Sequence, residues 1–142
     1  MKLKPCVSER IYLDANIYMD YCDERRDSIR PLGDIAFGLF RRTLSCEFEI
    51  VISDWVIEEV EKNVKNRIAM ENLIAELKAK GKIIYAESTH GERSKAKKHV
   101  NWRDALHTVI AKRSGCKYVV TRNMVDFLEF SDVLEPILPE QL

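Results

Sequence analysis

The most informative stretch of the sequence is Ile11-Tyr12-Leu13-Asp14-Ala15-Asn16, in which a short apolar run ends in an acid and an amide. A second stretch of this kind, Tyr118-Val119-Val120-Thr121-Arg122-Asn123-Met124-Val125-Asp126-Phe127, lies near the C-terminus. In an open parallel sheet, ligands bind where the carboxyl ends of the strands meet at a reversal of strand order. We therefore predict that Asp14 and the loop from Thr121 to Asp126 converge on one site.

Short apolar runs alternate with longer amphipathic stretches along the chain. The runs predict strands at 10–14, 49–53, 82–86 and 117–121, with a weak fifth at 133–138. Helices are expected at 17–29, at 34–44, between 56 and 81 as one helix or two, and between 101 and 115. This order, with right-handed crossovers, predicts an α/β protein: a three-layer α/β/α sandwich with a mainly parallel four- or five-stranded sheet. We expect a single domain over residues 1–142.

The composition narrows the class of protein. The 23 Lys and Arg residues balance 23 Asp and Glu residues, so overall charge gives no argument for nonspecific nucleic-acid binding. No apolar segment is long enough to cross a membrane and no secretory leader is visible, so we expect a cytoplasmic protein without a membrane partner. The four cysteines lack Cys-x-x-Cys spacing, which excludes a zinc ribbon and favours free thiols.

Several acids are expected at the edge where strands end or helices begin. They are Asp14 after the first strand, Glu58 and Glu59 in the helix after Ser53, Asp104 in the helix after Asn101, and Asp126 after the fourth strand. Two carboxylates ~4 Å apart repel by ~4 kcal/mol at an effective dielectric near 20, so a group of them needs a cation or raised pKa values. Oxygen ligands without Cys or paired His favour Mg²⁺ or Mn²⁺ over zinc.

Each acid also has a purely structural interpretation. Asp14 could simply precede a helix whose N-cap is Asn16, and Asp104 could serve only the N-terminus of its helix. Glu59 could be a solvated helix residue, with Glu58 as the spare candidate.

Two other groups of residues are expected to be structural. The run containing Asp20, Asp23, Glu24 and Asp27 is interpreted as a charged surface. The three histidines, His90, His99 and His107, lack paired ligand spacing, so no histidine metal site is predicted and His107 is assigned to packing or surface.

Taken together, these motifs resemble the PIN-domain ribonucleases, whose small members include the VapC toxins of toxin–antitoxin pairs. The resemblance rests on four pieces in order, Leu13-Asp14-Ala15-Asn16, Ile52-Ser53 followed by Glu59-Val60, Asp104 at a helix start, and Val120-Thr121-Arg122-Asn123 with Asp126-Phe127. It implies an endoribonuclease that depends on Mg²⁺ or Mn²⁺, with Asp14, Glu59, Asp104 and Asp126 as catalytic metal ligands. Asn16, Thr121 and Asn123 would support them, although the family often has Asp where this chain has Asn123.

The resemblance also implies partners. They are an RNA substrate, an antitoxin protein and a second copy in a homodimer. The alternative is a catalytically weak PIN-like module that binds RNA or protein. A phosphatase with Asp14 as nucleophile is disfavoured because its usual second acid, two residues later, is Asn16.

A stretch without acids precedes Asp104 and carries five basic residues. These are Arg93, Lys95, Lys97, Lys98 and Arg103. They are candidates for binding an RNA backbone, with a solvated loop as the alternative. Trp102 could stack on a base, but its apolar stripe favours the core.

Overall fold

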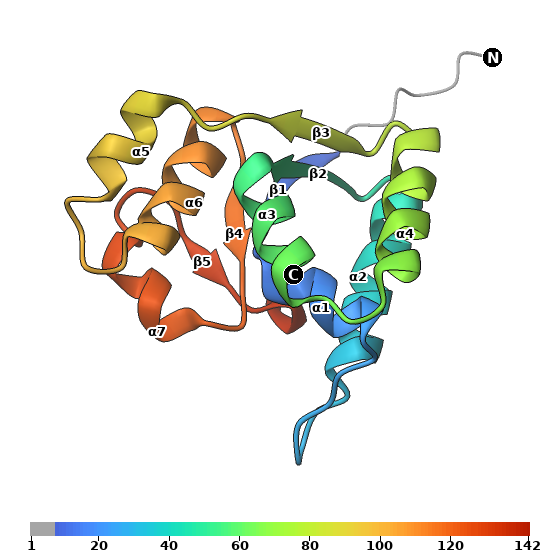
Figure 1. Cartoon of the computed structure of the whole chain (residues 1–142). Coiled ribbons are helices and arrows are strands. Elements are labelled where there is room, and N and C mark those ends of the chain that lie inside the picture. Colours follow the sequence, from blue (N-terminus) through green and yellow to red (C-terminus); the bar gives the residue numbers. More distant parts are fainter. Residues whose placement is uncertain (1–7) are drawn as a thin grey trace.

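The computed structural model describes residues 8–142, which are built around one five-stranded sheet (Figure 1). The strand order is β3-β2-β1-β4-β5 and every pairing is parallel, so the predicted α/β class with a parallel sheet is confirmed. The weak fifth strand is present but short. The strands are β1 (Glu9–Leu13), β2 (Phe48–Ser53), β3 (Ile83–Ala86), β4 (Tyr118–Val120) and β5 (Pro136–Ile137).

The helices form two groups, because right-handed crossovers run first from β1 toward β3 and then return to β4 on the other face. Contacts follow this division: α1 packs against α2, α3 and α4, whereas α6 packs against α5 and α7 (Figure 1). The helices are α1 (Ala15–Cys22), α2 (Leu32–Leu44), α3 (Asp54–Asn63), α4 (Arg67–Ala79), α5 (His90–Ala96), α6 (Trp102–Arg113) and α7 (Met124–Phe127), with short 3-10 turns at Leu128–Phe130 and Pro139–Gln141.

The central strand β1 fixes the interior of the protein. Ile11, Tyr12 and Leu13 are fully buried because β2 and β4 flank the strand and helices cover both faces. Complete burial of an aliphatic side chain contributes about 1.5–3 kcal/mol, so these three residues are a substantial part of the core. Within residues 8–142, no helix has the length and apolarity needed to span a membrane.

One helix boundary differs from the sequence expectation, and one alternative that the sequence left open is resolved. The helix predicted at 17–29 ends at Cys22, because Glu24 takes a φ of +47°, outside helical geometry. Further along, the Asp27 carboxylate forms a turn by accepting hydrogen bonds from the backbone N–H groups of Ile29 and Arg30. The stretch from 56 to 81 is two helices. Asp23 accepts hydrogen bonds from the backbone N–H groups of Lys65 and Asn66 at the break between them.

Helix α5 was not predicted, although its start carries a sequence signal. Thr89 and Glu92 form a capping box, in which each side chain accepts a hydrogen bond from the other residue's backbone N–H. The stretch interpreted as a basic loop therefore begins as a helix.

The interpretation of Asp20 as a surface residue was wrong. Its side chain is buried and accepts a hydrogen bond from Arg122 Nε at 2.8 Å, and Arg122 also pairs with Glu140. A buried carboxylate needs such a partner because removal from water is costly for a charge. The pair ties α1 to the segment that follows β4.

The cysteines meet the expectation in part. Cys22 and Cys116 are free and buried. Cys46 is disulfide-bonded, so the expectation of a free thiol was wrong there, and Cys6 lies outside the described residues.

Candidate metal centre

Asp14 lies where the sheet brings the two informative stretches together. Leu13 of β1 pairs with Val120 of β4, and the backbone N–H of Asp14 donates to the Val120 carbonyl at 2.9 Å. The next residue of each strand is therefore adjacent, and Thr121 Oγ1 donates to Asp14 Oδ2 at 2.8 Å. The predicted convergence of Asp14 with the loop after β4 is present in the structure.

The Asp14 carboxylate also caps α1. Its Oδ1 accepts from the backbone N–H of Ala15 at 2.7 Å, so the N-cap is Asp14 and not Asn16. The Asn16 amide instead donates to Asp14 Oδ2 at 3.1 Å. The capping role and a ligand role are compatible because a carboxylate has about four lone-pair sites.

Glu59 and Asp104 come from helices on opposite faces of the sheet. Ser53 ends β2 and caps α3 by accepting from the Val56 N–H, and this cap directs Glu59, on the second turn of α3, toward Asp14. Asp104 lies in the first turn of α6, where the helix dipole favours a negative charge.

The loop after β4 supplies the remaining predicted residues. The Thr121 hydroxyl accepts from the Asn123 N–H at 3.0 Å, and the Asn123 side chain donates to Asp126 Oδ2 at 2.6 Å. Asn123, at the position where the family often has Asp, thus holds Asp126 at the start of α7.

These residues line one open cavity of about 570 Å³, a volume within the usual range for ligand sites. Asp14, Asn16, Glu59, Asp104, Asn123 and Asp126 are all in its lining, together with Trp102 and Arg103. The four acids predicted from the sequence therefore share a cavity. Glu58 is not in the lining and pairs with Lys62 on the surface.

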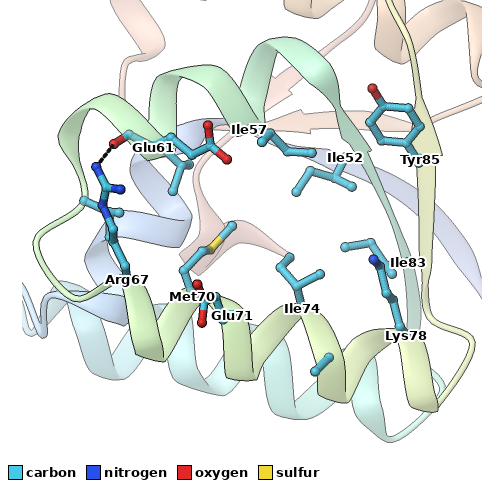
Figure 2. A pocket seen from close by; sticks show the side chains of 13 residues that line it. Ile52, Ile57, Glu61, Arg67, Met70, Glu71, Ile74, Lys78, Ile83 and Tyr85 are labelled. Atoms are coloured by element: carbon cyan, nitrogen blue, oxygen red, sulfur yellow. Dashed lines mark hydrogen bonds between the residues drawn. The ribbon is translucent and has the colours of Figure 1, made fainter.

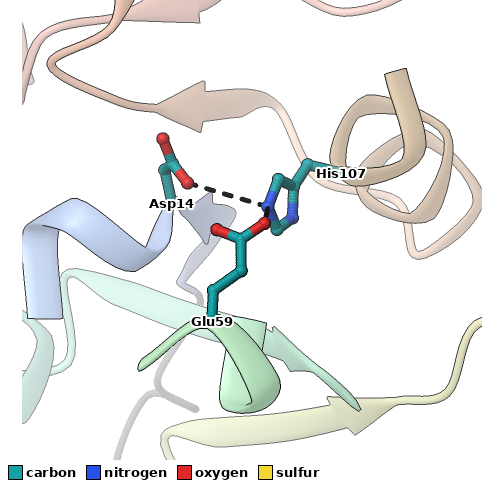
Figure 3. Close-up of side chains that lie close together, drawn as sticks. All are labelled: Asp14, Glu59 and His107. Carbon is teal, nitrogen blue, oxygen red and sulfur yellow. Dashed lines mark hydrogen bonds and ion pairs between the residues drawn. The ribbon is translucent and has the colours of Figure 1, made fainter. Parts of the chain in front are cut away.

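His107 is the site residue that the sequence interpretation missed. It is fully buried on α6, one helical turn after Asp104, and its Nε2 lies 3.0 Å from Glu59 Oε1 and 3.7 Å from Asp14 Oδ1 (Figure 3). These three side chains offer ligand atoms within 4.8 Å of one another. The spacing of Asp104 and His107, which places both on one helix face, was the available signal.

The carboxyl groups of this cavity are removed from water to a large extent, and their charges repel one another. Burial, with the charge of Asp14 as the next cause, raises the pKa of Asp104 to about 6. Burial also raises the pKa of Asp14, although His107 and the Thr121 hydrogen bond oppose the increase. The cavity is therefore short of positive charge.

The donor set fits a hard divalent cation. Carboxylate oxygens from Asp14, Glu59, Asp104 and Asp126 are the ligands that Mg²⁺ and Mn²⁺ prefer. A further oxygen, Asn16 Oδ1, is buried beside Asp14 and has no hydrogen-bond partner among residues 8–142. A cation, or a water molecule bound to it, would satisfy this oxygen.

The predicted basic flank is divided in the structure. Arg93 does not face the cavity, because it pairs with Asp54 at 2.6 Å and donates to Ser88 Oγ. Lys97 Nζ and Arg103 Cζ lie 5.8 Å and 5.6 Å from the ring centroid of Trp102. Lys95 and Lys98 are exposed on the same segment.

The Trp102 side chain is half-buried. It packs against Trp55 with ring centroids 5.2 Å apart, and it also lines the cavity. A half-buried ring beside two cations at the mouth of an acidic cavity is a suitable surface for a nucleobase.

A second hollow, of about 580 Å³, lies between α3 and α4 and is largely apolar (Figure 2). Ile57, Val60 and Ile74 are among its apolar lining residues. The charged residues Glu61 and Lys78 also line it (Figure 2). Helix α3 separates this apolar groove from the acidic cavity, because Glu59 and Asn63 line the cavity while Val60 and Val64 line the groove.

The raised pKa of Asp104 gives a prediction for the metal-free protein. A folded pKa of about 6 against an ordinary 3.8 means that the folded state binds the proton more tightly, so Asp104 lowers stability as pH rises through this interval. The full shift corresponds to about 3 kcal/mol, which solvent screening reduces to about 1 kcal/mol. Asp104→Asn should therefore stabilise the metal-free protein by about 1 kcal/mol at pH 7.

Urea unfolding at pH 4 and pH 7 measures this effect. The gain of Asp104→Asn should disappear at pH 4, and Asp132→Asn, at an exposed acid, should show no gain at either pH. A gain of equal size at both pH values would contradict the electrostatic explanation.

No protein-family model and no curated protein matches this sequence. Among solved structures, the fold is similar to that of VapBC2 from Rickettsia felis bound to a DNA fragment from its promoter, with a TM-score of 0.55 and 16% sequence identity. The match covers 91% of this chain and 96% of that chain. The chain thus shares its fold with a protein of the VapBC class over nearly its whole length.

Proposed function

We propose that the protein is a metal-dependent endoribonuclease of the PIN type that hydrolyses RNA phosphodiester bonds. The observation that carries the proposal is the convergence of Asp14, Glu59, Asp104 and Asp126 on one open cavity at the carboxyl edge of the sheet. The fold shared with VapBC2 supports it, because in such parallel sheets ligands bind at the carboxyl edge of the strands.

Mg²⁺ or Mn²⁺ would be held by Asp14 and Glu59, with Asp104 and Asp126 as further ligands. When bound, such an ion polarises the phosphoryl oxygen and lowers the pKa of a water molecule. The chain's own residues orient these ligands. Thr121 fixes Asp14 Oδ2, and Asn123 fixes Asp126.

Asp104 is suited to move a proton. Its carboxylate lines the same cavity as Asp14, where it would order the attacking water or accept a proton from it. Asn16 Oδ1, which has no partner among the described residues, is a suitable acceptor for an ordered water in the same cavity.

The RNA would approach over the segment that joins α5 to α6. Lys97 and Lys98 on this segment, with Arg103 at the start of α6, would contact backbone phosphates, and Trp102 would offer a ring for a base. Lys95 is exposed in the last turn of α5, whereas Arg93 pairs with Asp54 and would act only through the structure of α5.

A second candidate function is a PIN-like binding module with little turnover. The observation that favours it is Asn123, because an amide in this position removes a negative charge from the cavity and occupies Asp126. Such a module would bind RNA or protein in the same cavity without cleaving the RNA.

The proposal also includes a protein partner in the cytoplasm. The resemblance to the VapC toxins implies an antitoxin, and the apolar groove between α3 and α4 offers a place for an apolar segment of it. A partner in this groove would lie across α3 from Glu59 and could reach the acidic cavity. Homodimerisation is a further expectation from the family resemblance.

The first prediction from the proposed function concerns Asp14. Asp14→Asn keeps the size of the side chain but removes the charge of a metal ligand, so cleavage of an end-labelled RNA pool with Mn²⁺ should fall at least about a hundredfold, or about 2.7 kcal/mol in barrier. The wild-type protein should cleave with Mn²⁺ or Mg²⁺ and not with EDTA.

Asp132→Asn is the matched control, because it removes an exposed carboxylate and should cleave like the wild type. Metal-dependent cleavage that survives in Asp14→Asn would refute the site. Intact RNA in every lane, together with RNA binding, would favour the binding module.

The second prediction concerns the basic flank. Reversing two charges in Lys97→Glu with Lys98→Glu should weaken RNA binding and make its logarithmic salt slope shallower by about 2, since each lost phosphate contact accounts for about 1. Filter binding at several salt concentrations measures both quantities. Lys112→Glu, at the far end of α6, is the control, and equal binding by both variants would exclude the flank.

The third prediction concerns the groove. Ile74→Asp places a charge in its apolar lining and should prevent co-purification with the product of an adjacent small reading frame. Ile68→Asp makes the same change on an exposed position of α4 outside the lining and should leave the complex intact. A complex that tolerates Ile74→Asp equally well does not use this groove.

A further inference from the structure

A chain of buried hydrogen bonds runs from the start of α3 back to Glu59 on the same helix. Ser53 Oγ lies 2.7 Å from the Tyr12 hydroxyl, which lies 2.6 Å from His107 Nδ1, and His107 Nε2 lies 3.0 Å from Glu59 Oε1. Ser53, Tyr12 and His107 are all fully buried. The acidic cavity therefore has a polar support behind it that connects two strands, β1 and β2, with two helices, α3 and α6.

We propose that His107 is a positioning residue whose Nε2–H donates to Glu59 and holds this carboxylate toward Asp14, and that it is not itself a ligand of the cation. The inference rests on the proposed function, because it concerns the metal ligands of that site. The close grouping of Asp14, Glu59 and His107 is compatible with two roles for His107, metal ligand or support for Glu59. The proposal assigns the second role.

The donor and the acceptor in each of these hydrogen bonds can be assigned from the groups present. Ser53 Oγ already accepts from the Val56 N–H, and its one other partner among residues 8–142 is the Tyr12 hydroxyl. The Ser53 O–H must therefore donate to Tyr12, or it is buried without an acceptor, at a cost of about 1–3 kcal/mol. Tyr12 then donates its own proton to His107 Nδ1.

An imidazole that accepts at Nδ1 carries its proton on Nε2 when it is neutral. This tautomer points an N–H at Glu59 Oε1 and leaves no lone pair on Nε2 for a metal ion. The opposite tautomer would leave the Ser53 hydroxyl without an acceptor and would direct a lone pair at two carboxylates.

The donor role does not depend on the charge of the ring. In the imidazolium form both nitrogens carry protons, so Nδ1 donates to Tyr12 while Nε2 still donates to Glu59. In both forms one lone pair of Glu59 Oε1 accepts from His107. The remaining lone pairs of Glu59, together with Asp14, stay available to the cation.

Long-range ¹H–¹⁵N correlation NMR on histidine-labelled protein tests the tautomer directly, first without metal and then with Mg²⁺. We expect a proton on His107 Nε2 in both samples. A proton on Nδ1 alone, or loss of the Nε2 proton when Mg²⁺ is added, would overturn the proposal. The metal-free spectrum is informative even if the protein has no nuclease activity.

A pair of variants tests the positioning of Glu59. The side-chain nitrogen of Gln resembles Nε2 in reach, whereas that of Asn resembles Nδ1 and stops short of Glu59. His107→Asn should weaken Mn²⁺ binding, measured by electron paramagnetic resonance, by about 10–100-fold, as expected for loss of a support to a metal ligand. His107→Gln should recover most of this affinity.

Thermal unfolding of both variants controls for the fold. If the folded His107→Asn protein binds Mn²⁺ like the wild type, or if His107→Gln loses as much affinity as His107→Asn, His107 does not position the ligand. Failure of the wild-type protein to bind Mn²⁺ would instead refute the proposed function. The NMR spectrum would still show which ring nitrogen of His107 carries the proton.

Discussion

The pairing of β1 with β4 is the interaction on which the rest of the site depends. These strands are far apart in the sequence, and their parallel register sets Leu13 beside Val120. Because both strands end at the same edge, Asp14 and Thr121 follow as neighbours and bond through the Thr121 hydroxyl. The strand order reverses here, so no crossover covers this edge, and a cavity remains open above it.

The second constraint is electrostatic. Burial of Asp104 and Asp14, with repulsion from neighbouring acids as a smaller cause, raises the pKa of both carboxyls and so raises the free energy of the metal-free fold near neutral pH. Such strain persists only where the surrounding structure holds the groups in place. The buried hydrogen-bonded series of Ser53, Tyr12 and His107 provides this support, because all three residues are fully buried and the series ends on Glu59.

Much of the fold was predictable because it depends on local pattern. Apolar runs of strand length, amphipathic stretches and the positions of Asp14 and Thr121 at strand ends gave the class, the parallel sheet and the converging edge. Helix ends were less predictable. Helix α1 ends where Glu24 takes a positive φ, and α3 is separated from α4 where Asp23 accepts from backbone N–H groups more than forty residues away in the sequence.

By itself, the sequence determined which acids were available and in which order they followed the strands, since side-chain chemistry and strand periodicity are local properties. Only the tertiary structure decided which polar side chains are buried. Asp20 became buried because Arg122, after β4, reached it, and His107 joined the site because α6 packs where Tyr12 and Glu59 meet. These outcomes depend on partners distant in the chain, whose proximity is a consequence of sheet order and helix packing.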